Sequence, residues 1–360
     1  MSKKKISFIA QFPPPIHGLS KAVETLYNSN LTDEFEFEKI DITDNKDFAK
    51  NLIKIISSQA DLFYFTISQT RGGNFRDLII LKLLSLKRKK CIIHLHGGHY
   101  RKLLDTELNK WQKKLNYKYM KHVNGAIVLS KTLTKVFEGI IDKKKVFTVP
   151  NCVDNEFLSS EVEFQRKLAR LYKKKVLNIL YLSNFIESKG YRDVLKMAQF
   201  EKERVLSGSA KRFHFNFAGK FFEVKEKDFF TKYIRENKLE EFVTYHGIVE
   251  SEQKRELLQK GDIFILLTRY PNEGQPISML EAMGNGMVIV TTDHAGIPDI
   301  ITDKVNGVVI NKDAINISKI YDLLHDLEIS SVATHNREEA LSKYSEKKYL
   351  DNMRNIFINN

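Results

Sequence analysis

Short runs of apolar residues alternate along the chain with longer segments in which apolar residues recur every three or four positions. The short runs are typical of buried strands and the longer segments of amphipathic helices. In the first half of the chain the predicted strands are residues 5–10, 61–67, 91–95, 125–129 and 145–149. In the second half they are residues 176–183, 213–218, 242–246, 261–269, 287–291 and 307–310. Strands that alternate with helices predict parallel sheets covered by helices on both faces.

Two domains are the default expectation, because 360 residues exceed what one compact core of ordinary size holds. A charged stretch at residues 161–175 separates the two series of strands and predicts a linker. We therefore predict an N-terminal domain at residues 1–170 and a C-terminal domain at residues 171–340, followed by a terminal helix within residues 341–360.

The stretch from Glu273 to Glu281 (EGQPISMLE) joins a predicted strand to a predicted helix. Pro276 suits the first helical turn, where a missing N–H group loses no hydrogen bond. Such a helix start offers main-chain N–H groups and a partial positive charge to an anion or a sugar hydroxyl. The two glutamates could hold opposite ends of one polar ligand. The alternative is an ordinary loop acid at Glu273 and a solvated helix residue at Glu281, as in most pairs with this spacing.

A second strand–loop–helix junction lies at residues 11–18 (QFPPPIHG), which follow the first predicted strand. This arrangement is typical of the phosphate-facing loop of doubly wound domains. Neither G-x-G-x-x-G nor G-x4-G-K-[ST] occurs in the sequence. Their absence argues against a dinucleotide-binding domain with the usual fingerprint and against a P-loop enzyme.

Three histidines, His94, His96 and His99, surround the end of the predicted strand 91–95. His-x-His places two imidazoles on one strand face, which suggests a metal site. No carboxylate or cysteine accompanies them nearby, and we expect no metal. The donor-rich loop at residues 68–76 follows another strand. With His99, its Arg71 and Arg76 are candidates for an acceptor site.

The net charge of +13 and the pI near 9.3 suit nucleic acid, an anionic membrane surface or phosphorylated substrates. Positive charge gathers at residues 87–90 (KRKK) and on a predicted helix at residues 103–121. The apolar positions of that helix are Leu104, Leu108, Trp111, Leu115 and Tyr119. A helix packed on its sheet and a face that docks on anionic lipid both fit the pattern. We expect no nucleic acid partner, because the aromatic residues are assigned to packing and no recognition module is visible.

Cysteine usage and the N-terminal residues indicate the compartment. Cys91 and Cys152 lack paired spacing, which predicts a reducing cytoplasm and no disulfide. The start, MSKKKISFIAQF, predicts a first strand instead of a signal peptide, and no apolar run approaches the roughly 18 residues that span a bilayer. We expect a cytoplasmic protein, peripheral on the inner face of the membrane if the basic face binds lipid.

The run from residue 273 to residue 300 (EGQPISMLEAMGNGMVIVTTDHAGIPDI) closely resembles the signature of family 4 of the retaining GT-B glycosyltransferases. Residues 149–154 (VPNCVD) resemble the family's Pro-Asn-Gly-Val-Asp segment, with Cys152 in place of the glycine. The resemblance covers nearly the whole chain and is strongest from residue 176 to residue 310. It implies two doubly wound Rossmann-like domains that face each other across a cleft, with the C-terminal helix crossing back to the first domain.

The resemblance also implies a reaction. A hexose-type sugar would pass from a nucleotide diphosphate sugar, with UDP and GDP both open, to a glycan or lipid-linked glycan acceptor. The anomeric configuration would be retained, with neither a metal nor a cofactor beyond the donor substrate. Bacterial surface polysaccharides, namely capsule, O-antigen or exopolysaccharide, are the expected products.

Residue roles follow from the matched positions of the family. Glu281 would hold the ribose hydroxyls, and Glu273 the hydroxyls of the transferred hexose. Lys189 would hold the diphosphate, His96 would lie near the transferred sugar, and Gly18 would let the main chain approach the donor. Glu273, His96 and Lys189 are the implied catalytic residues. The further donor-binding positions are Gly219, Lys220 and Ile248 around the base and Gly274, Gln275, Pro276, Ile277 and Ser278 along the sugar and phosphate.

One position departs from the family. Asn184 stands where most members carry an arginine that holds the diphosphate with the lysine. An asparagine donates hydrogen bonds but carries no charge. Either Lys189 acts alone, or another base such as Arg192 or Lys220 substitutes.

Three alternatives remain. Asn184 favours a catalytically weak GT-B protein that binds a nucleotide sugar or a partner without transfer. A GT-B epimerase or phosphorylase agrees poorly with the signature, and no lysine motif for a pyridoxal cofactor stands out. A basic nucleic-acid-binding protein would show a steep salt dependence and indifference to nucleotide sugars.

Overall fold

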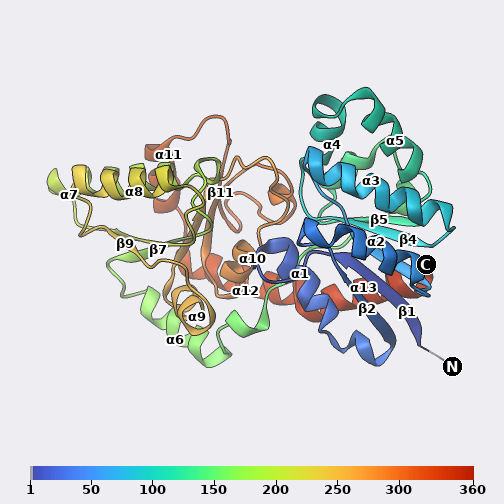
Figure 1. The fold of residues 1–360 in the computed structure, drawn as a ribbon. Helices are drawn as coiled ribbons and strands as arrows, with labels where there is room; N and C mark the ends of the chain where they lie inside the picture. Colours follow the sequence, from blue (N-terminus) through green and yellow to red (C-terminus); the bar gives the residue numbers. More distant parts are fainter. Residues whose placement is uncertain (1–2) are drawn as a thin grey trace. The chain divides into compact units, whose positions relative to one another are not determined.

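The computed structural model describes residues 3–360, which form two compact units. Unit 1 contains the chain up to Asn151, the short segment Asn272–Gln275 and the terminal segment Lys347–Asn360. Unit 2 contains Cys152–Pro271 and Pro276–Glu346. Each unit is built on one parallel sheet of six strands with helices packed against it (Figure 1). The predicted α/β class is confirmed.

The sheet of unit 1 has the strand order β2-β1-β3-β4-β5-β6. Its strands are β1 (Lys4–Ala10), β2 (Phe35–Asp41), β3 (Leu62–Thr66), β4 (Cys91–Leu95), β5 (Gly125–Val128) and β6 (Val146–Thr148). Strand β2 is absent from the sequence-based prediction, because its sequence FEFEKID has no continuous apolar run. As an edge strand it needs only the period-two alternation of apolar and charged residues that this segment shows.

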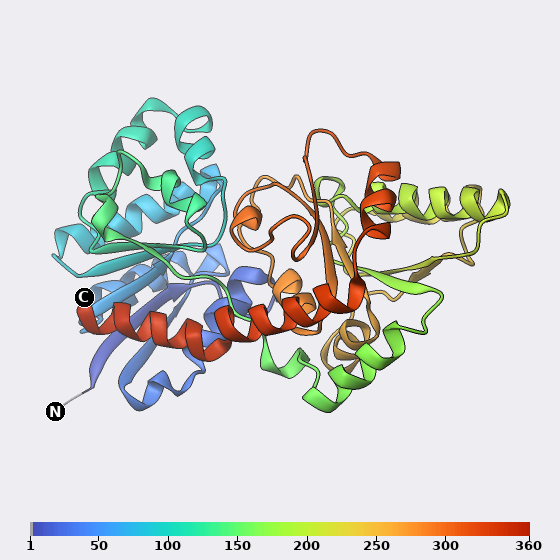
Figure 2. The same ribbon diagram turned by 180° about the vertical axis from the view of Figure 1, so that it is seen from behind.

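Helices cover both faces of this sheet. They are α1 (Gly18–Tyr27), α2 (Phe48–Ser57), α3 (Arg71–Leu86), α4 (Tyr100–Lys102), α5 (Lys110–Met120) and α13 (Glu346–Asn359). Successive residues of β1 point to opposite faces: Phe8 contacts the ring of Phe357 in α13, and Ile9 belongs to the core formed with α2, α3 and α5. Figure 2 shows α13 lying along the unit 1 sheet.

The predicted helix at residues 103–121 is broken in the structure. A π-helical turn, Leu103–Glu107, precedes α5, and Leu108 is extended. The Asn109 side chain then caps α5 by accepting the N–H of Gln112 at 2.8 Å. The buried face of α5 is formed by Gln112, Asn116, Tyr119 and Met120, whereas Trp111, in the first turn of the helix, is 56% exposed. Its predicted packing on the sheet is therefore wrong.

The sheet of unit 2 has the strand order β12-β11-β10-β7-β8-β9. Its strands are β7 (Leu177–Leu182), β8 (Phe213–Ala218), β9 (Val243–Tyr245), β10 (Ile263–Leu266), β11 (Val288–Thr292) and β12 (Gly307–Ile310). All six were predicted, because each is rich in apolar or aromatic residues and is bounded by glycine or polar residues. The crossover from β9 to β10 places β10 beside β7 in the middle of the sheet.

The helices of unit 2 are α6 (Glu161–Leu171), α7 (Tyr191–Leu206), α8 (Val224–Glu236), α9 (Ser251–Lys260), α10 (Ile277–Gly284), α11 (Ile317–His325) and α12 (Ile329–Lys343). The predicted linker at residues 161–175 is mainly α6, which starts with a capping box between Ser160 and Glu163 and buries Phe164. The compact units accordingly divide at Asn151, earlier than the predicted boundary at residue 170. In the chain from residue 3 onward, no helix is both long and apolar enough to cross a bilayer.

Candidate functional site

The carboxyl end of β4 in unit 1 carries His96, Gly97 and Gly98, against which the loop Asn272–Gln275 packs. The Gly98 N–H donates to the Glu273 carbonyl at 2.8 Å. A Cβ atom on Gly97 would clash with the Asn272 carbonyl, and one on Gly274 with the His96 carbonyl. Both positions therefore require glycine for the two main chains to touch. The contact holds Glu273, which is 7% exposed, beside the loop of His96.

The far end of this loop is also held within unit 1. The Asn151 N–H donates to Gln275 Oε1 at 2.6 Å, and Asn151 Nδ2 donates to the Gln275 carbonyl at 2.9 Å. Asn151 belongs to the segment VPNCVD, in which the sequence suggested no hydrogen-bonding role for it. Gln275, an expected donor-binding residue, thus uses its side-chain oxygen and its carbonyl to fix the loop.

His96 is held as a neutral imidazole. Both of its ring nitrogens are buried and have no hydrogen-bond partner among residues 3–360, although the residue as a whole is only half-buried. Burial first, and then the charge of His17, lowers the pKa of His96 to about 3. Its ring lies 3.9 Å, centroid to centroid, from that of His94. Buried polar atoms without partners are uncommon, and these two nitrogens are available to a ligand.

The other two histidines of the cluster have protein partners. His94 Nδ1 lies 2.6 Å from the Tyr64 hydroxyl, and burial lowers the pKa of His94. His99 Nε2 lies 2.8 Å from Glu107 Oε1, while its main-chain N–H donates to Gln69. Within the described part of the chain, no three His, Cys, Asp or Glu side chains gather in a way that could hold a metal ion.

The loop after β1 ends in the N-terminus of α1, as predicted. His17 caps the helix: its ring accepts the Ser20 N–H at 3.3 Å, and the Ser20 hydroxyl accepts the His17 N–H at 2.9 Å. Burial lowers the pKa of His17. A Cβ atom on Gly18 would meet no described atom within 4 Å. Packing therefore does not require a glycine there, and the space beside it stays open at a helix N-terminus.

The expected acceptor-side arginines differ in their surroundings. Arg76 donates to the buried Asp77 carboxylate at 2.9 Å and to the Ile42 carbonyl at 3.3 Å. Its charge is therefore used inside unit 1. Arg71 is exposed at the first turn of α3.

In unit 2, the loops after β7 and β10 lie side by side, because these strands are neighbours in the sheet. The Arg269 N–H donates to the Ser188 carbonyl at 2.6 Å. Gly190 has φ +82°, and a Cβ atom there would clash with the Leu267 carbonyl. The glycine thus permits the close approach that places Lys189 Nζ 5.1 Å from the ring centroid of Tyr270.

Glu281 lies on α10, which begins at Ile277 after Pro276 in the N-cap position. It is 1% exposed, which excludes a solvated helix residue. Lys254 of α9 places its ammonium 2.7 Å from Glu281 Oε1 and 3.8 Å from the centroid of the Phe157 ring. This partner was not predicted, since α9 and α10 are separated by a strand in the sequence.

The C-terminal end of α10 is fixed by three buried polar side chains. Lys167 donates to the Asn285 carbonyl at 2.7 Å, and Arg337 donates to the Gly284 carbonyl at 2.8 Å. Asn285 itself accepts the Ser159 N–H at 2.9 Å. Cations at a helix C-terminus interact favourably with its dipole. Burial lowers the pKa of Lys167 to about 7, so desolvation opposes its charged form.

The loops after β8 and β9 also meet. Gly219 has φ +145° and donates its N–H to the Gly247 carbonyl at 2.8 Å. Lys220 is exposed and has no carboxylate partner in the described chain; its ammonium lies 5.7 Å from the Phe222 ring centroid. Ile248 is exposed as well. The carboxyl edge of the sheet therefore gathers the predicted residues Gly219, Lys220 and Ile248 near the Lys189 loop.

Asn184 and Arg192 do not restore the missing charge. The Asn184 carbonyl accepts the Tyr181 hydroxyl at 3.0 Å. Arg192 lies 3.1 Å from both Glu187 and Glu226, and its guanidinium stacks over the Phe229 ring. Two carboxylates already neutralise Arg192, which leaves Lys220 as the better substitute of the two expected bases.

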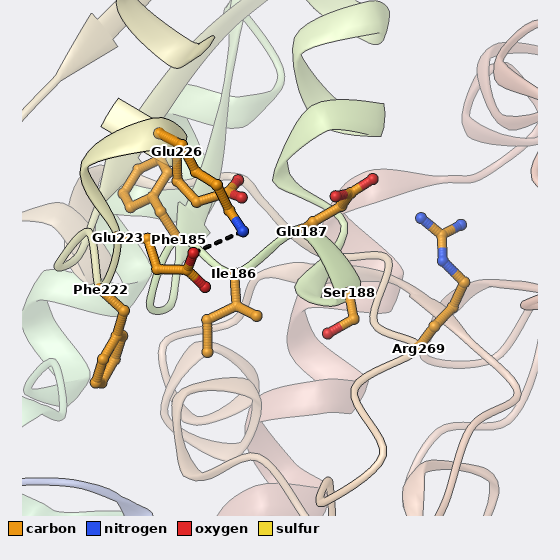
Figure 3. Close-up of a pocket in the computed structure, with 9 residues that line it drawn as sticks. Phe185, Ile186, Glu187, Ser188, Phe222, Glu223, Glu226 and Arg269 are labelled. Carbon is orange, nitrogen blue, oxygen red and sulfur yellow. Dashed lines mark ion pairs between the residues drawn. The ribbon is translucent and has the colours of Figure 1, made fainter. Parts of the chain in front are cut away.

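An open pocket of about 420 Å³ borders the Lys189 loop in unit 2 (Figure 3). Its lining residues are Phe185, Ile186, Glu187, Ser188, Phe222, Glu223, Lys225, Glu226 and Arg269. Three glutamates face two basic residues, and one of these, Lys225, is paired with Glu223 at 2.6 Å. The other two glutamates pair with Arg192 at 3.1 Å, so the carboxylates of this pocket beside the Lys189 loop already have cationic partners.

Comparison with known proteins places this geometry in a family. The chain is 25% identical over 298 residues to an uncharacterized 41.2 kDa protein in the cps region of Klebsiella pneumoniae, with 74% of each chain covered. It is 26% identical to a poly(ribitol-phosphate) alpha-N-acetylglucosaminyltransferase of Staphylococcus aureus, with 73% of this chain and 50% of that protein covered.

Solved structures share the fold. HepE of Anabaena, crystallised with UDP, superposes with a TM-score of 0.73 at 14% identity over 99% of this chain and all of that one. At this identity the match shows the GT-B fold alone. The family model for glycosyl transferases group 1 matches residues 162–348, which is more than half of the chain. The protein is a member of the glycosyl transferases group 1 family and has its two-sheet GT-B fold.

Proposed function

We propose that the protein is a retaining glycosyltransferase that moves a hexose-type sugar from a UDP- or GDP-sugar to a glycan or lipid-linked glycan. It would act in the cytoplasm in the synthesis of a bacterial surface polysaccharide. The observation that carries the proposal is the glycine-mediated contact of Gly97 and Gly274, which holds a buried acid, Glu273, beside the neutral His96. The relatives from the Klebsiella cps region and from Staphylococcus support a bacterial surface polymer as the product.

Donor binding is assigned mainly to unit 2. A carboxylate such as Glu281 accepts hydrogen bonds from two adjacent hydroxyls, which suits a ribose. Lys189 offers its charge to the diphosphate and stabilises it as a leaving group. Lys220 is the proposed second cation in place of the arginine absent at Asn184. The main chain of residues 274–278 would meet the sugar and phosphate at the start of α10.

Two groups of unit 1 are assigned to the transferred hexose. Glu273 would accept hydrogen bonds from its hydroxyls, and His96 would donate or accept one without carrying charge. A neutral imidazole cannot act as a strong acid at neutral pH, so its role is positional. The bond from the anomeric carbon to the phosphate oxygen breaks, the acceptor oxygen bonds to the same face, and the departing phosphate takes the acceptor's proton. Positioning and leaving-group stabilisation then supply most of the rate.

The roles can be separated kinetically. Glu281→Ala should raise the donor KM with a smaller effect on kcat, because it removes binding shared by ground state and transition state. Glu273→Ala and Lys189→Ala should mainly lower kcat, by about 100-fold or more, as loss of one such electrostatic contact does elsewhere. The measurement is steady-state transfer of radiolabelled sugar to membrane-extracted acceptor. Wild-type kcat in Glu273→Ala would contradict the assignment.

A second candidate is a catalytically weak protein that binds a nucleotide sugar without transfer. Asn184 favours it, because one expected positive charge beside the diphosphate is missing. Slow hydrolysis of the donor without acceptor would argue against it, whereas tight binding with neither hydrolysis nor transfer would support it.

A further inference from the structure

Exposed apolar side chains gather on one helical layer of unit 1. Phe75 and Leu86 of α3 are 48% and 73% exposed, and Trp111 of α5 is 56% exposed. The rings of Phe75 and Trp111 lie 6.2 Å apart, centroid to centroid. Trp111 is the only tryptophan of the chain. An exposed pair of large aromatic residues is unusual unless something covers it.

Basic residues share this surface. Lys82 lies on the same face of α3 as Phe75 and Leu86, at spacings of seven and four residues. Lys114 and Lys118 are three and seven residues beyond Trp111 on α5, and all three lysines are exposed. We call Phe75, Lys82, Leu86, Trp111, Lys114 and Lys118 the α3–α5 face. Figure 1 labels the two helices that carry it.

The two helices are firmly held together beneath this face. Asn74 of α3 and Asn116 of α5 exchange two side-chain hydrogen bonds of 3.0 Å, and Gln112 donates to the Arg71 carbonyl. The α3–α5 face is therefore a fixed surface and not two independent helices.

Its exposed charge has one sign. The sequence of α5 contains no acidic residue, and the only acid of α3, Asp77, is buried against Arg76. None of Lys82, Lys114 and Lys118 has a carboxylate partner within residues 3–360. By contrast, in the neighbouring KRKK segment Lys87, Lys89 and Lys90 donate to main-chain carbonyls.

We propose that the α3–α5 face docks on an anionic lipid bilayer, with Trp111 and Phe75 at the level of the head groups. Aromatic residues prefer this interface, and lysines beside them reach lipid phosphates while their alkyl stems cover apolar surface. A second copy of the face is disfavoured, because two lysine-rich surfaces would repel each other. Duplex nucleic acid would engage the lysines but leave the apolar side chains uncovered.

The single tryptophan provides a direct test with the full chain. Its fluorescence is recorded with phosphatidylcholine vesicles that contain or lack phosphatidylglycerol, and binding is measured in parallel by co-sedimentation. Insertion of Trp111 into the interface should shift its emission to the blue with anionic vesicles only, and added salt should weaken binding. Addition of duplex DNA should produce no such shift.

Matched variants distinguish an effect of the α3–α5 face from an effect of the net charge of the protein. Lys82→Gln, Lys114→Gln and Lys118→Gln together should weaken vesicle binding on the order of 100-fold, since each lysine near the surface contributes about fivefold. The control triple is Lys225→Gln, Lys232→Gln and Lys260→Gln, which changes the net charge equally on exposed residues of unit 2. It should bind like the wild type. Phe75→Ser should reduce the fluorescence shift, whereas Leu206→Ser, at an exposed position of α7, should not.

Three results would overturn the proposal: no binding to anionic vesicles, binding without a blue shift, or equal losses in the two triple variants. The test uses no nucleotide sugar. A failure here is therefore distinguishable from a failure of the proposed glycosyl transfer, which donor binding and turnover report.

Discussion

At the scale of single residues, the pairing of Glu281 with Lys254 has a measurable consequence. Lys254→Met removes the ammonium that lies 2.7 Å from the 1% exposed Glu281 carboxylate, and with it a contact that orients this carboxylate toward the proposed ribose hydroxyls. We predict a loss of donor affinity of about tenfold, since a charge-assisted hydrogen bond contributes roughly 1.5 kcal/mol or more. Isothermal titration with the nucleotide diphosphate measures it.

Lys260→Met is the matched control, because Lys260 lies on the same helix and places its ammonium 2.6 Å from Glu256 at the surface. Its donor affinity should equal that of the wild type. Unchanged affinity in Lys254→Met would remove Lys254 from the account of the donor site.

The lowered pKa of His96 leads us to predict that the stability of the protein depends on pH. The pKa of this histidine is about 3 in the folded protein and ordinarily near 6.5, so between these values the unfolded chain binds the proton more strongly. The contribution of His96 to the free energy of unfolding should therefore be at its maximum above pH 6.5. Below that pH the free energy of unfolding should fall by up to about 1.4 kcal/mol per pH unit. Urea unfolding followed by Trp111 fluorescence reports on unit 1, where both residues lie.

His96→Asn should reduce this slope, since asparagine does not titrate. His325→Asn, at an exposed position of unit 2, should leave it unchanged. Identical slopes in wild type and His96→Asn would contradict a buried neutral imidazole.

The strand–loop–helix junctions that carry Glu273, Glu281 and Lys189 could be predicted from local patterns, whereas the roles of these residues stay predictions from the resemblance. Lys254 and Asn151, which contact Glu281 and Gln275, come from distant segments with no signal of their own. The predicted acceptor-side Arg76 is used internally by Asp77, its neighbour in sequence, a pairing that needed burial to become visible.

At the scale of elements, the turn before α7 depends on Gly190. Alanine there would combine the strain of φ +82° with a clash against the Leu267 carbonyl. We predict a loss of several kcal/mol in unit 2 stability and weaker donor binding, because Lys189 precedes this turn. Calorimetric unfolding measures the first effect.

Gly208→Ala separates strain from clash. Gly208 has φ +94°, but a Cβ atom there would meet nothing within 4 Å. The loss of stability in Gly208→Ala should be limited to the roughly 1 kcal/mol that a strained alanine costs. Equal losses at the two glycines would show that the close approach to β10 is unimportant.

Strands were predicted where apolar or aromatic residues dominate the segment. All six strands of unit 2 were found, whereas the edge strand β2 was missed because charged residues lie between its apolar ones. The many charged residues of α6 led us to predict a linker there. In the structure this segment is a helix that buries Phe164 and Lys167. The break before α5 could not be predicted from periodicity, because a π-helical turn and an Asn109 cap shift the phase without an intervening proline or glycine.

At the scale of the whole molecule, we expected two α/β parts and a C-terminal helix that crosses back to the first one. Unit 1 does contain Lys347–Asn360, but it also contains Asn272–Gln275, which was not expected. Asn272–Gln275 is held in unit 1 by the glycine contact with the His96 loop. Lys347–Asn360 is held there by Phe357, which packs against the ring of Phe8. Contacts at such sequence separations leave no local pattern.

The central claim is that this chain binds a nucleotide diphosphate sugar through Glu281 and Lys189. The most direct test is thermal unfolding with a panel of UDP, GDP, other nucleoside diphosphates and their sugars. A ligand that binds only the folded state must raise the midpoint, by an amount set by its concentration relative to Kd. We predict that at least one member of the panel stabilises the wild type and that Glu281→Ala loses the shift. No shift with any of them, or an equal shift in Glu281→Ala, would contradict the account.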